Sequence, residues 1–229
     1  MGELIKLFEK IAEYYGHTVS SIIMLVIIIS YSVYIILKNY SSTIKKYFEN
    51  KLLEKEKQHV RATQYRKDIT PKVKHRLSEL ALSIKADRAL LFEFSNGTSN
   101  LLGLPFLFIS ATTEVLSRET LPMSNTYQKI NVSLIAEFLD KLEQKGYYYT
   151  ENIISIKDEY PILFNMLDLN NIKSVLFYGV SGELGEIGFL MVATNRNNTF
   201  TREAALPEVA HTAQLISSYL NFNILDKEL

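Results

Sequence analysis

The chain has no cysteine and no tryptophan among its 229 residues, and only five prolines and nine glycines. Without cysteine it can form no disulfide, thiolate nucleophile or cysteine-ligated metal centre, which excludes thiol proteases, zinc ribbons and thiol reductases. An excess of either charge is also missing, because 25 Lys and Arg residues balance 25 Asp and Glu residues. No overall field attracts nucleic acid, so we expect no nucleic-acid partner.

What the chain does have is a hydrophobic share of 47%, typical of a globular protein, and one long uncharged run at residues 18–37. Twenty helical residues cover about 30 Å, the hydrocarbon thickness of a bilayer. We therefore predict a single transmembrane helix at 18–38. A buried core helix is the alternative, and it is disfavoured because the run has no polar face.

The leader at residues 1–17 has helical spacing of its apolar side chains, which predicts a short amphipathic helix or an extension of the span. Its mixed acidic and basic residues disfavour a cleaved signal peptide. The leader holds two Lys, whereas the 20 residues from Lys38 to Lys57 hold six. By the positive-inside rule, the part after the span is expected in the cytoplasm, and the protein in the bacterial inner membrane.

Residues 39–69 form a charged connector without glycine. Nine basic residues against three acidic ones between 38 and 67 suit anionic lipid headgroups, each basic residue near the surface contributing about 1 kcal/mol. The apolar residues keep one helical stripe, which indicates either a parallel coiled coil in a homodimer or a single helix lying on its own domain. The stripe consists of Ile44, Tyr47, Phe48, Leu52 and Val60.

Residues 70–229 show the pattern of a globular α+β domain. Thr70-Pro71 is a favourable helix start, and a helix with a buried face follows. The succeeding order is two strands, a helix, a strand, a short helix, two strands and a closing helix, with Gly182–Gly185 as a hairpin turn. We predict a mostly antiparallel sheet covered by its first and last helices. The predicted strands lie at 88–94, 105–115, 147–150, 174–180 and 185–194, and the predicted helices at 133–144, 160–167 and from Ala205 to Leu220.

Three stretches of this domain resemble the GAF family, the relatives of PAS domains. Residues 86–94 resemble the first strand, residues 174–195 resemble the last hairpin, and Asn195, Phe200 and Glu203 resemble the start of the closing helix. Pro207 departs from the family pattern, since a helix former is usual there. The resemblance covers about residues 71–222 and implies an antiparallel sheet with helices on one face and a pocket on the other. It also implies a small-molecule or interaction module.

A second resemblance is to membrane-anchored GAF-like proteins of bacteriophages. It rests on the segment 94–97, on Asn100, on residues 103–106 and on Ser110 and Glu114. In that pattern His is expected where this chain has Ser95. The departure removes a titratable group from this segment.

Strand alternation assigns Glu93 to the same face as Ala89, Leu91 and Ser95. A carboxylate inside an apolar strand costs several kcal/mol unless it is paired, so Glu93 is the outstanding polar residue of the domain. One interpretation makes it a pocket carboxylate that accepts hydrogen bonds from a ligand. The other places it at an exposed strand end or makes it a structural partner of Arg88 or a Lys.

Polar residues that follow Glu93 are candidates for the rim of a cavity, with aromatic side chains as its walls. The alternative is a hairpin loop above an aromatic core. The wall candidates include Phe177, and the rim candidates include Thr112. The predicted ligand-binding residues are Glu93, Ser95, Asn96, Asn100, Phe106, Phe108, Ser110 and Tyr178.

No feature indicates catalysis: a phosphate-binding loop, a nucleophile elbow and a paired acid site are missing. His59, His75 and His211 suggest no shared site, so we expect no metal, no cofactor and no enzyme. Two function classes remain. The first is a membrane-anchored sensory or regulatory module that binds a small ligand or protein partner and passes its output to another chain. The second is a structural or interaction protein that organises partners at the inner membrane.

Overall fold

The computed structural model describes residues 2–99, 105–117, 120–183, 185–196 and 199–221. The chain forms two compact units, Met1–Arg61 and Ala62–Leu229. The sequence predicts a domain start at residue 70, whereas the globular unit begins eight residues sooner. The reason is contact: the Tyr65 hydroxyl donates to the carbonyl of Tyr219 at 2.7 Å, and the Ile69 side chain is buried.

The first unit contains α1 (Gly2–Tyr15) and the beginning of α2 (His17–Ser83). Gly16 separates the two helices with a φ of 81°, a left-handed conformation that glycine adopts without strain. Among the described residues, α2 is long and apolar enough to cross a membrane by length and composition. Side chains of its apolar part, such as Ile28 and Ile36, are exposed.

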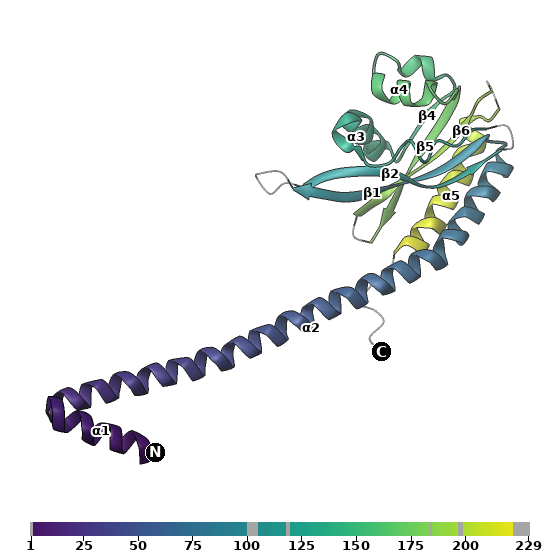
Figure 1. Cartoon of the computed structure of the whole chain (residues 1–229). Coiled ribbons are helices and arrows are strands. Elements are labelled where there is room, and N and C mark those ends of the chain that lie inside the picture. The colour runs from purple at the N-terminus through teal and green to yellow at the C-terminus, as the bar shows by residue number, and fades with distance from the viewer. Residues whose placement is uncertain (1, 100–104, 118–119, 184, 197–198, 222–229) are drawn as a thin grey trace. The chain divides into compact units, whose positions relative to one another are not determined.

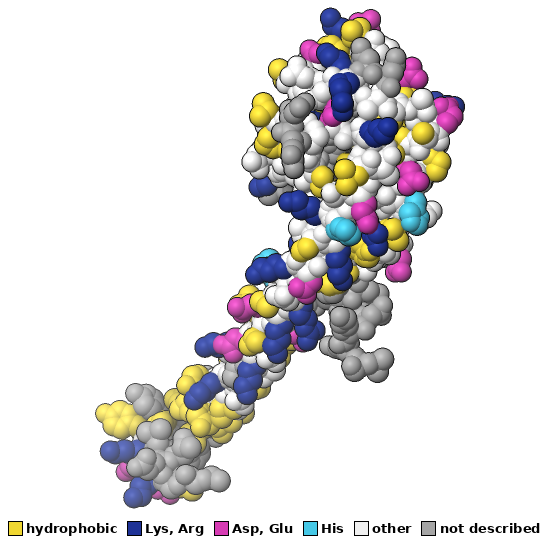
Figure 2. Space-filling view, turned by 90° about the vertical axis from the view of Figure 1, so that its right-hand side faces the viewer, with side chains coloured by type: hydrophobic (Ala, Val, Ile, Leu, Met, Phe, Trp, Pro, Cys, Tyr) yellow, Lys and Arg dark blue, Asp and Glu magenta, His cyan; other side chains and the backbone are white. Residues whose placement is uncertain are grey.

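The predicted connector is helical and belongs to α2. All five apolar side chains of its stripe are exposed, from 43% for Ile44 to 71% for Leu52, so no other part of the described chain covers them. Lys and Arg side chains are spaced along this segment (Figure 2). The connector therefore presents both an apolar stripe and a basic surface.

No helix begins at Thr70-Pro71, contrary to the prediction, because α2 runs through both residues to Ser83. The Thr70 hydroxyl donates to the carbonyl of Arg66 at 2.7 Å, a bond that threonine makes inside helices. Proline removes one backbone donor from a helix interior. Here the buried residues on both sides of it, Ile69 and Val73, keep the helix against the sheet.

The globular unit is built on one six-stranded sheet in the order β3-β2-β1-β6-β5-β4, with every neighbouring pair antiparallel. This confirms the predicted α+β class. The strands are β1 (Arg88–Ser99), β2 (Pro105–Leu116), β3 (Ile130–Asn131), β4 (Tyr147–Thr150), β5 (Ser174–Gly182) and β6 (Gly185–Thr194). The helices of the unit besides α2 are α3 (Ala136–Lys145), α4 (Pro161–Asp168) and α5 (Arg202–Leu220), and the short 3-10 turns are η1 (Val132–Leu134) and η2 (Ile153–Ile156).

Helices cover both faces of the sheet. Figure 1 shows α5 beside the last part of α2 on one face, and α3 and α4 on the other. We call these the α2–α5 face and the α3–α4 face. Strand alternation divides β1 between them: Ala89 and Leu91 pack with the α2–α5 core, whereas Leu90 and Phe92 pack with the α3–α4 core. The sequence predicts that only the first and last helices cover the sheet. The structure adds a second helical layer, formed by α3 and α4, on the opposite face.

The predicted hairpin between β5 and β6 is present. Gly182 pairs with Gly185, and Gly185 has a φ of 127°, which other residues rarely adopt. Leu184, the other predicted turn residue beside Glu183, lies outside the described residues. The hairpin brings two apolar strands to the centre of the sheet, so residues of β6 contribute to both cores.

The closing helix α5 begins at Arg202, capped by the Thr201 hydroxyl, which accepts from the Ala204 amide at 3.4 Å. Pro207 lies inside the helix, so it does not delay the start of α5. The predicted buried side is confirmed by four residues that face the sheet. These are Ala205, Val209, Ala213 and Ile216.

Candidate functional site

A cleft of about 320 Å³ opens on the α3–α4 face, between the first turns of α3 and α4. Residues 133–138 form one wall and residues 159–163 form the other. Pro161 occupies the first turn of α4, where its missing N–H leaves no helical hydrogen bond unmade. At the other end, α3 stops at Gly146, whose φ of 75° favours glycine. Two short helices with defined ends thus frame the cleft.

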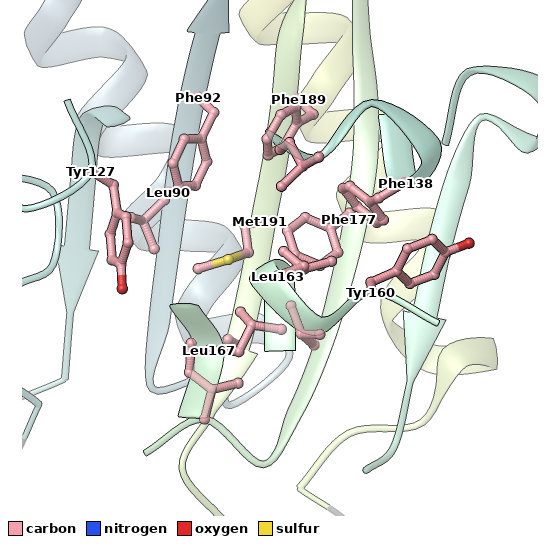
Figure 3. Packing of buried hydrophobic residues seen from close by; sticks show 14 of the residues in the cluster. Leu90, Phe92, Tyr127, Phe138, Tyr160, Leu163, Leu167, Phe177, Phe189 and Met191 are labelled. Carbon is pink, nitrogen blue, oxygen red and sulfur yellow. The ribbon is translucent and has the colours of Figure 1, made fainter. Parts of the chain in front are cut away.

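Aromatic rings form the inner side of this cleft. Phe138 and Tyr160 line it and also belong to the buried core of the α3–α4 face, with ring centroids 5.8 Å apart. Phe138 meets Phe177 at 4.8 Å in an edge-to-face arrangement, a favourable geometry for aromatic pairs. Figure 3 shows these rings gathered over the central strands, with Leu163 beside them. The cleft therefore leads directly onto the aromatic core.

A charged pair stands at the rim. Lys141 donates to Glu159 at 2.6 Å, and the Tyr160 hydroxyl donates to the same carboxylate oxygen at 2.8 Å. The hydrogen bond to Glu159 raises the pKa of Lys141, and the hydrogen bond from Lys141 lowers the pKa of Glu159. Burial, followed by the neighbouring Glu159 carboxylate, raises the pKa of Tyr160. Lys141 and Glu159 are therefore charged at neutral pH, and the Tyr160 hydroxyl keeps its proton.

A second polar group is buried at one end of the α3–α4 core. Arg88 is 1% exposed, and its Nη1 lies 4.0 Å from Glu114 Oε1. Its Nη2 donates to the Asn170 carbonyl at 3.3 Å, whereas Nε and Nη1 have no hydrogen-bond partner among the described residues. Burial lowers the pKa of Arg88, and the Glu114 carboxylate opposes that shift. Glu114 also accepts from the backbone amides of Met123 and Ser124, so it ties the segment after β2 to the core.

Glu93 does not face the α3–α4 cleft. It lies on the α2–α5 face, as the alternation from Ala89 predicts, and Arg66 of α2 binds its carboxylate through both guanidinium nitrogens, one of them at 2.8 Å. The Thr112 hydroxyl donates to the same carboxylate. The expected partner, Arg88 or a Lys, is wrong, because Arg88 points to the opposite face. Arg66 lies 27 positions away on a helix, and spacing along the chain did not indicate it.

Four other predicted residues lie near Glu93 on the first two strands. Ser110 is its register partner, and Ser95 pairs with Phe108. The Ser110 hydroxyl accepts from the Lys129 amide at 2.9 Å, and Ser95 and Asn96 are exposed. The structure therefore brings Glu93, Ser95, Phe108 and Ser110 together at the end of β1 and β2, away from the α3–α4 cleft. Two further predicted ligand residues, Asn100 and the side chain of Phe106, lie outside the described residues.

Tyr178 and Phe177 cannot line one cavity, because adjacent strand residues point to opposite faces. Phe177 is buried in the α3–α4 core, whereas Tyr178 packs against the α2–α5 core. Tyr178 lines a separate cleft of about 350 Å³ near α5, together with Glu143 and Glu186. Burial, and secondly the nearby Glu143, raises the pKa of Glu186.

The main cleft is lined by residues other than the predicted ligand-binding residues. Phe138 and Tyr160 lie in segments predicted only as helices, and Lys141 and Glu159 are 18 positions apart in sequence. The one sequence feature that could have indicated this cleft is the set of aromatic residues at positions 138, 148, 160 and 177. Their rings form one cluster in the structure. Contacts across separate helices leave no spacing pattern in a sequence.

An antiparallel sheet of this order with helices on both faces is the GAF fold, and comparison with solved structures identifies it. The chain is similar to the GAF domain of PixJ from Thermosynechococcus elongatus in its blue-light-absorbing form, with a TM-score of 0.53, 11% identity, and coverage of 67% of this chain and 88% of that one. It is also similar to a far-red cyanobacteriochrome photoreceptor, with a TM-score of 0.50, 16% identity, and coverage of 75% and 97%.

The red/green cyanobacteriochrome NpR6012g4 in its green-light-absorbing state is a third similar structure. Its TM-score is 0.50 at 14% identity, and the match covers 66% of this chain and 92% of that one. No protein-family model matches the chain, and no curated protein matches it. At these identities the likeness establishes the fold.

Proposed function

We propose that this chain is a sensory or regulatory module whose GAF-fold domain binds a small ligand or a protein partner and has no catalytic output of its own. The cleft between α3 and α4 carries the proposal. Its aromatic floor and its charged rim combine apolar walls with a few polar groups, the usual composition of a small-molecule site. Its volume of about 320 Å³ suits a compact ligand of one or two rings.

The similar solved structures support this class, because they are photoreceptor domains that absorb light. A ligand in this chain could form no bond to a cysteine sulfur, since the chain has no cysteine. Contact with the Tyr160 ring and a hydrogen bond to the exposed Glu159 carboxylate would hold the ligand.

The test is to identify small molecules that co-purify with the full chain in mild detergent. Organic extraction and mass spectrometry should reveal a compound that Tyr160→Ala no longer retains, because its ring lines the cleft. Tyr178→Ala is the matched control, since that ring lies on the other face of the sheet. Retention by Tyr160→Ala and loss by Tyr178→Ala would move the site to the second cleft, and an empty spectrum would favour the interaction protein.

Membrane anchoring through residues 18–38, with the domain in the cytoplasm of a bacterial cell, completes the proposal. The apolar length of α2 and the excess of Lys after it support this arrangement. Anionic lipids would attract this region through the nine basic residues from Lys38 to Lys67. A cytoplasm-specific fluorescent reporter fused after Leu229 should be bright, and an active periplasmic reporter at the same point would reverse the orientation.

Homodimerisation through the connector is the proposed state of assembly. The exposed stripe, with Phe48 and Leu52 at 63% and 71%, would be buried by a second copy. Phe48→Glu together with Leu52→Glu should turn a dimer into a monomer in sedimentation of the detergent-solubilised chain. Asn50→Glu, which adds one negative charge off the stripe, should leave the dimer intact.

A structural or interaction protein, which organises partners at the inner membrane, is the second candidate. One observation favours it: Phe138, Phe177 and Phe189 are at most 2% exposed, so aromatic rings fill the space between the sheet and α3. In that case the full chain should retain a protein partner and no small molecule.

A further inference from the structure

Arg66, Glu93 and Thr112 form a polar cluster between α2 and the sheet, which we call the clasp. The two nitrogens of Arg66 bind the two carboxylate oxygens of Glu93, and the Thr112 hydroxyl donates to one of them. The Glu93 side chain is 15% exposed and that of Arg66 is 41% exposed. A bidentate pair fixes the orientation of both side chains as well as their distance.

The clasp holds the part of α2 that precedes its first buried side chain. Among the described residues of α2, Ile69 is the first buried side chain, and the apolar contacts of Val73, Leu77 and Leu80 follow it. Before Ile69, the contacts of α2 with the globular unit include the Tyr65 bond to Tyr219 and the clasp, both polar. Polar contacts near water are weaker than a packed core, so this end of the helix can be released without unfolding the rest.

The opposite side of the same strand leads to the α3–α4 cleft. Phe92 and Phe94 flank Glu93 in β1, and both rings contact Phe189, at centroid distances of 4.9 Å and 6.4 Å. Phe189 meets Phe138 at 6.5 Å, and Phe138 lines the cleft. A displacement of Phe138 therefore reaches the backbone of β1 through two ring contacts.

We infer that Arg66 and Glu93 are the coupling pair of this domain: they convert a change in the α3–α4 cleft into a change in how α2 is held. The inference rests on the proposed function, because it assigns the cleft as the site that is occupied. Strand β1 is the shared element, since its aromatic side chains face the cleft and its carboxylate holds α2. A shift of this strand strengthens or breaks the bidentate contact between Arg66 and Glu93. Residues 62–69 of α2 are then held more or less firmly against the sheet.

Hydrogen exchange of the full chain in detergent tests the clasp by itself. Arg66→Gln and Glu93→Gln should each speed amide exchange in residues 62–69 by about tenfold, and the double variant should add little to either. Lys74→Gln, which removes an exposed cation from the same helix, should leave that exchange unchanged. Unaltered exchange in both single variants, or fully additive effects, would overturn the clasp.

A substitution that fills the cleft then tests the coupling without any ligand. Ala136→Trp adds a large ring to the cleft wall, with Ser133→Phe as the second variant if the first lowers the melting temperature strongly. Exchange in residues 62–69 should change at least threefold in the chain with Glu93, and not in the Glu93→Gln background. An equal change in both backgrounds, or none in either, would contradict the coupling. Failure to find a co-purifying molecule would count against the proposed function and leave this result standing.

Discussion

The two faces of the sheet are closed in different ways. The α2–α5 core consists mostly of aliphatic side chains and alanines, and two long helices cover it. The α3–α4 core combines aliphatic side chains with six aromatic rings and two methionines, and two short helices and irregular segments cover it. Small residues let long helices lie close to a sheet. The aromatic core adjoins the cleft between α3 and α4, whereas the second cleft lies beside α5.

The two cores nevertheless share the strands β1, β5 and β6. Each central strand contributes alternate residues to both cores, so neither face can move alone. In β1, for example, Glu93 lies on the α2–α5 face, whereas its neighbours Phe92 and Phe94 pack into the α3–α4 core.

Truncating a large residue in each core is the strongest way to test the comparison. Phe138→Ala should destabilise the domain by about 3–5 kcal/mol and Leu77→Ala by about 2–5 kcal/mol, because each leaves a cavity. The Phe138 cavity adjoins the α3–α4 cleft, whereas Leu77 lies in the α2–α5 core. Benzene or indole should therefore raise the melting temperature of Phe138→Ala and not that of Leu77→Ala, measured by differential scanning calorimetry.

Two outcomes of this experiment would contradict the comparison of the two cores. Recovery of both variants by the same aromatic probe would mean that the two cores are equally accessible. No recovery of either would mean that the cleft does not reach the aromatic core.

A glycine substitution tests the close approach of the strands that both faces share. A Cβ at Gly188 would lie 1.9 Å from the carbonyl oxygen of Phe92, so Gly188→Ala should cost about 1–3 kcal/mol or more. Gly179→Ala is the control in the neighbouring strand, because its Cβ would meet nothing closer than 3.8 Å and should change stability by less than about 0.5 kcal/mol. Urea unfolding of both variants measures the difference, and equal midpoints would refute the close approach.

The smallest expected effect concerns Asp87, at the end of the α2–α5 face. Burial would raise the pKa of Asp87, but hydrogen bonds from Thr194, the Asn195 amide and Arg196 outweigh it and lower the pKa. A lowered pKa contributes stability above the unfolded value of about 3.9, and that contribution is lost as the pH falls through the lower folded value. Asp87→Asn should cost about 1–2 kcal/mol at pH 7.

Urea midpoints at pH 7 and pH 3 distinguish this effect from general acid sensitivity. The difference between Asp87→Asn and the unmodified chain should shrink at pH 3, whereas Asp140→Asn at an exposed position should match the unmodified chain at both. A gap that stays constant with pH would show that the Asp87 carboxylate does not supply the stability.

Much of the fold followed from local pattern. Apolar runs in residues 88–94, 174–180 and 185–194 predict strands, and the spacing of Ala205, Val209, Ala213 and Ile216 predicts the buried side of α5. The pair Gly182 and Gly185 predicted the hairpin, because a tight turn needs glycine conformations. These features depend on neighbours within one or two turns of the chain, so a single sequence contains them.

Only the tertiary structure decided which side of each strand meets which helices. The same packing decided which residues form the candidate site. A period of two separates Glu93 from Phe92 and Phe94, but it does not say that α2 covers the first and α3 the others. The pairing of Arg66 with Glu93, and of Phe138 with Phe177, joins residues 27 and 39 positions apart in sequence. Such contacts arise from how the helices cross the sheet, and that crossing is set by the packing of the whole core.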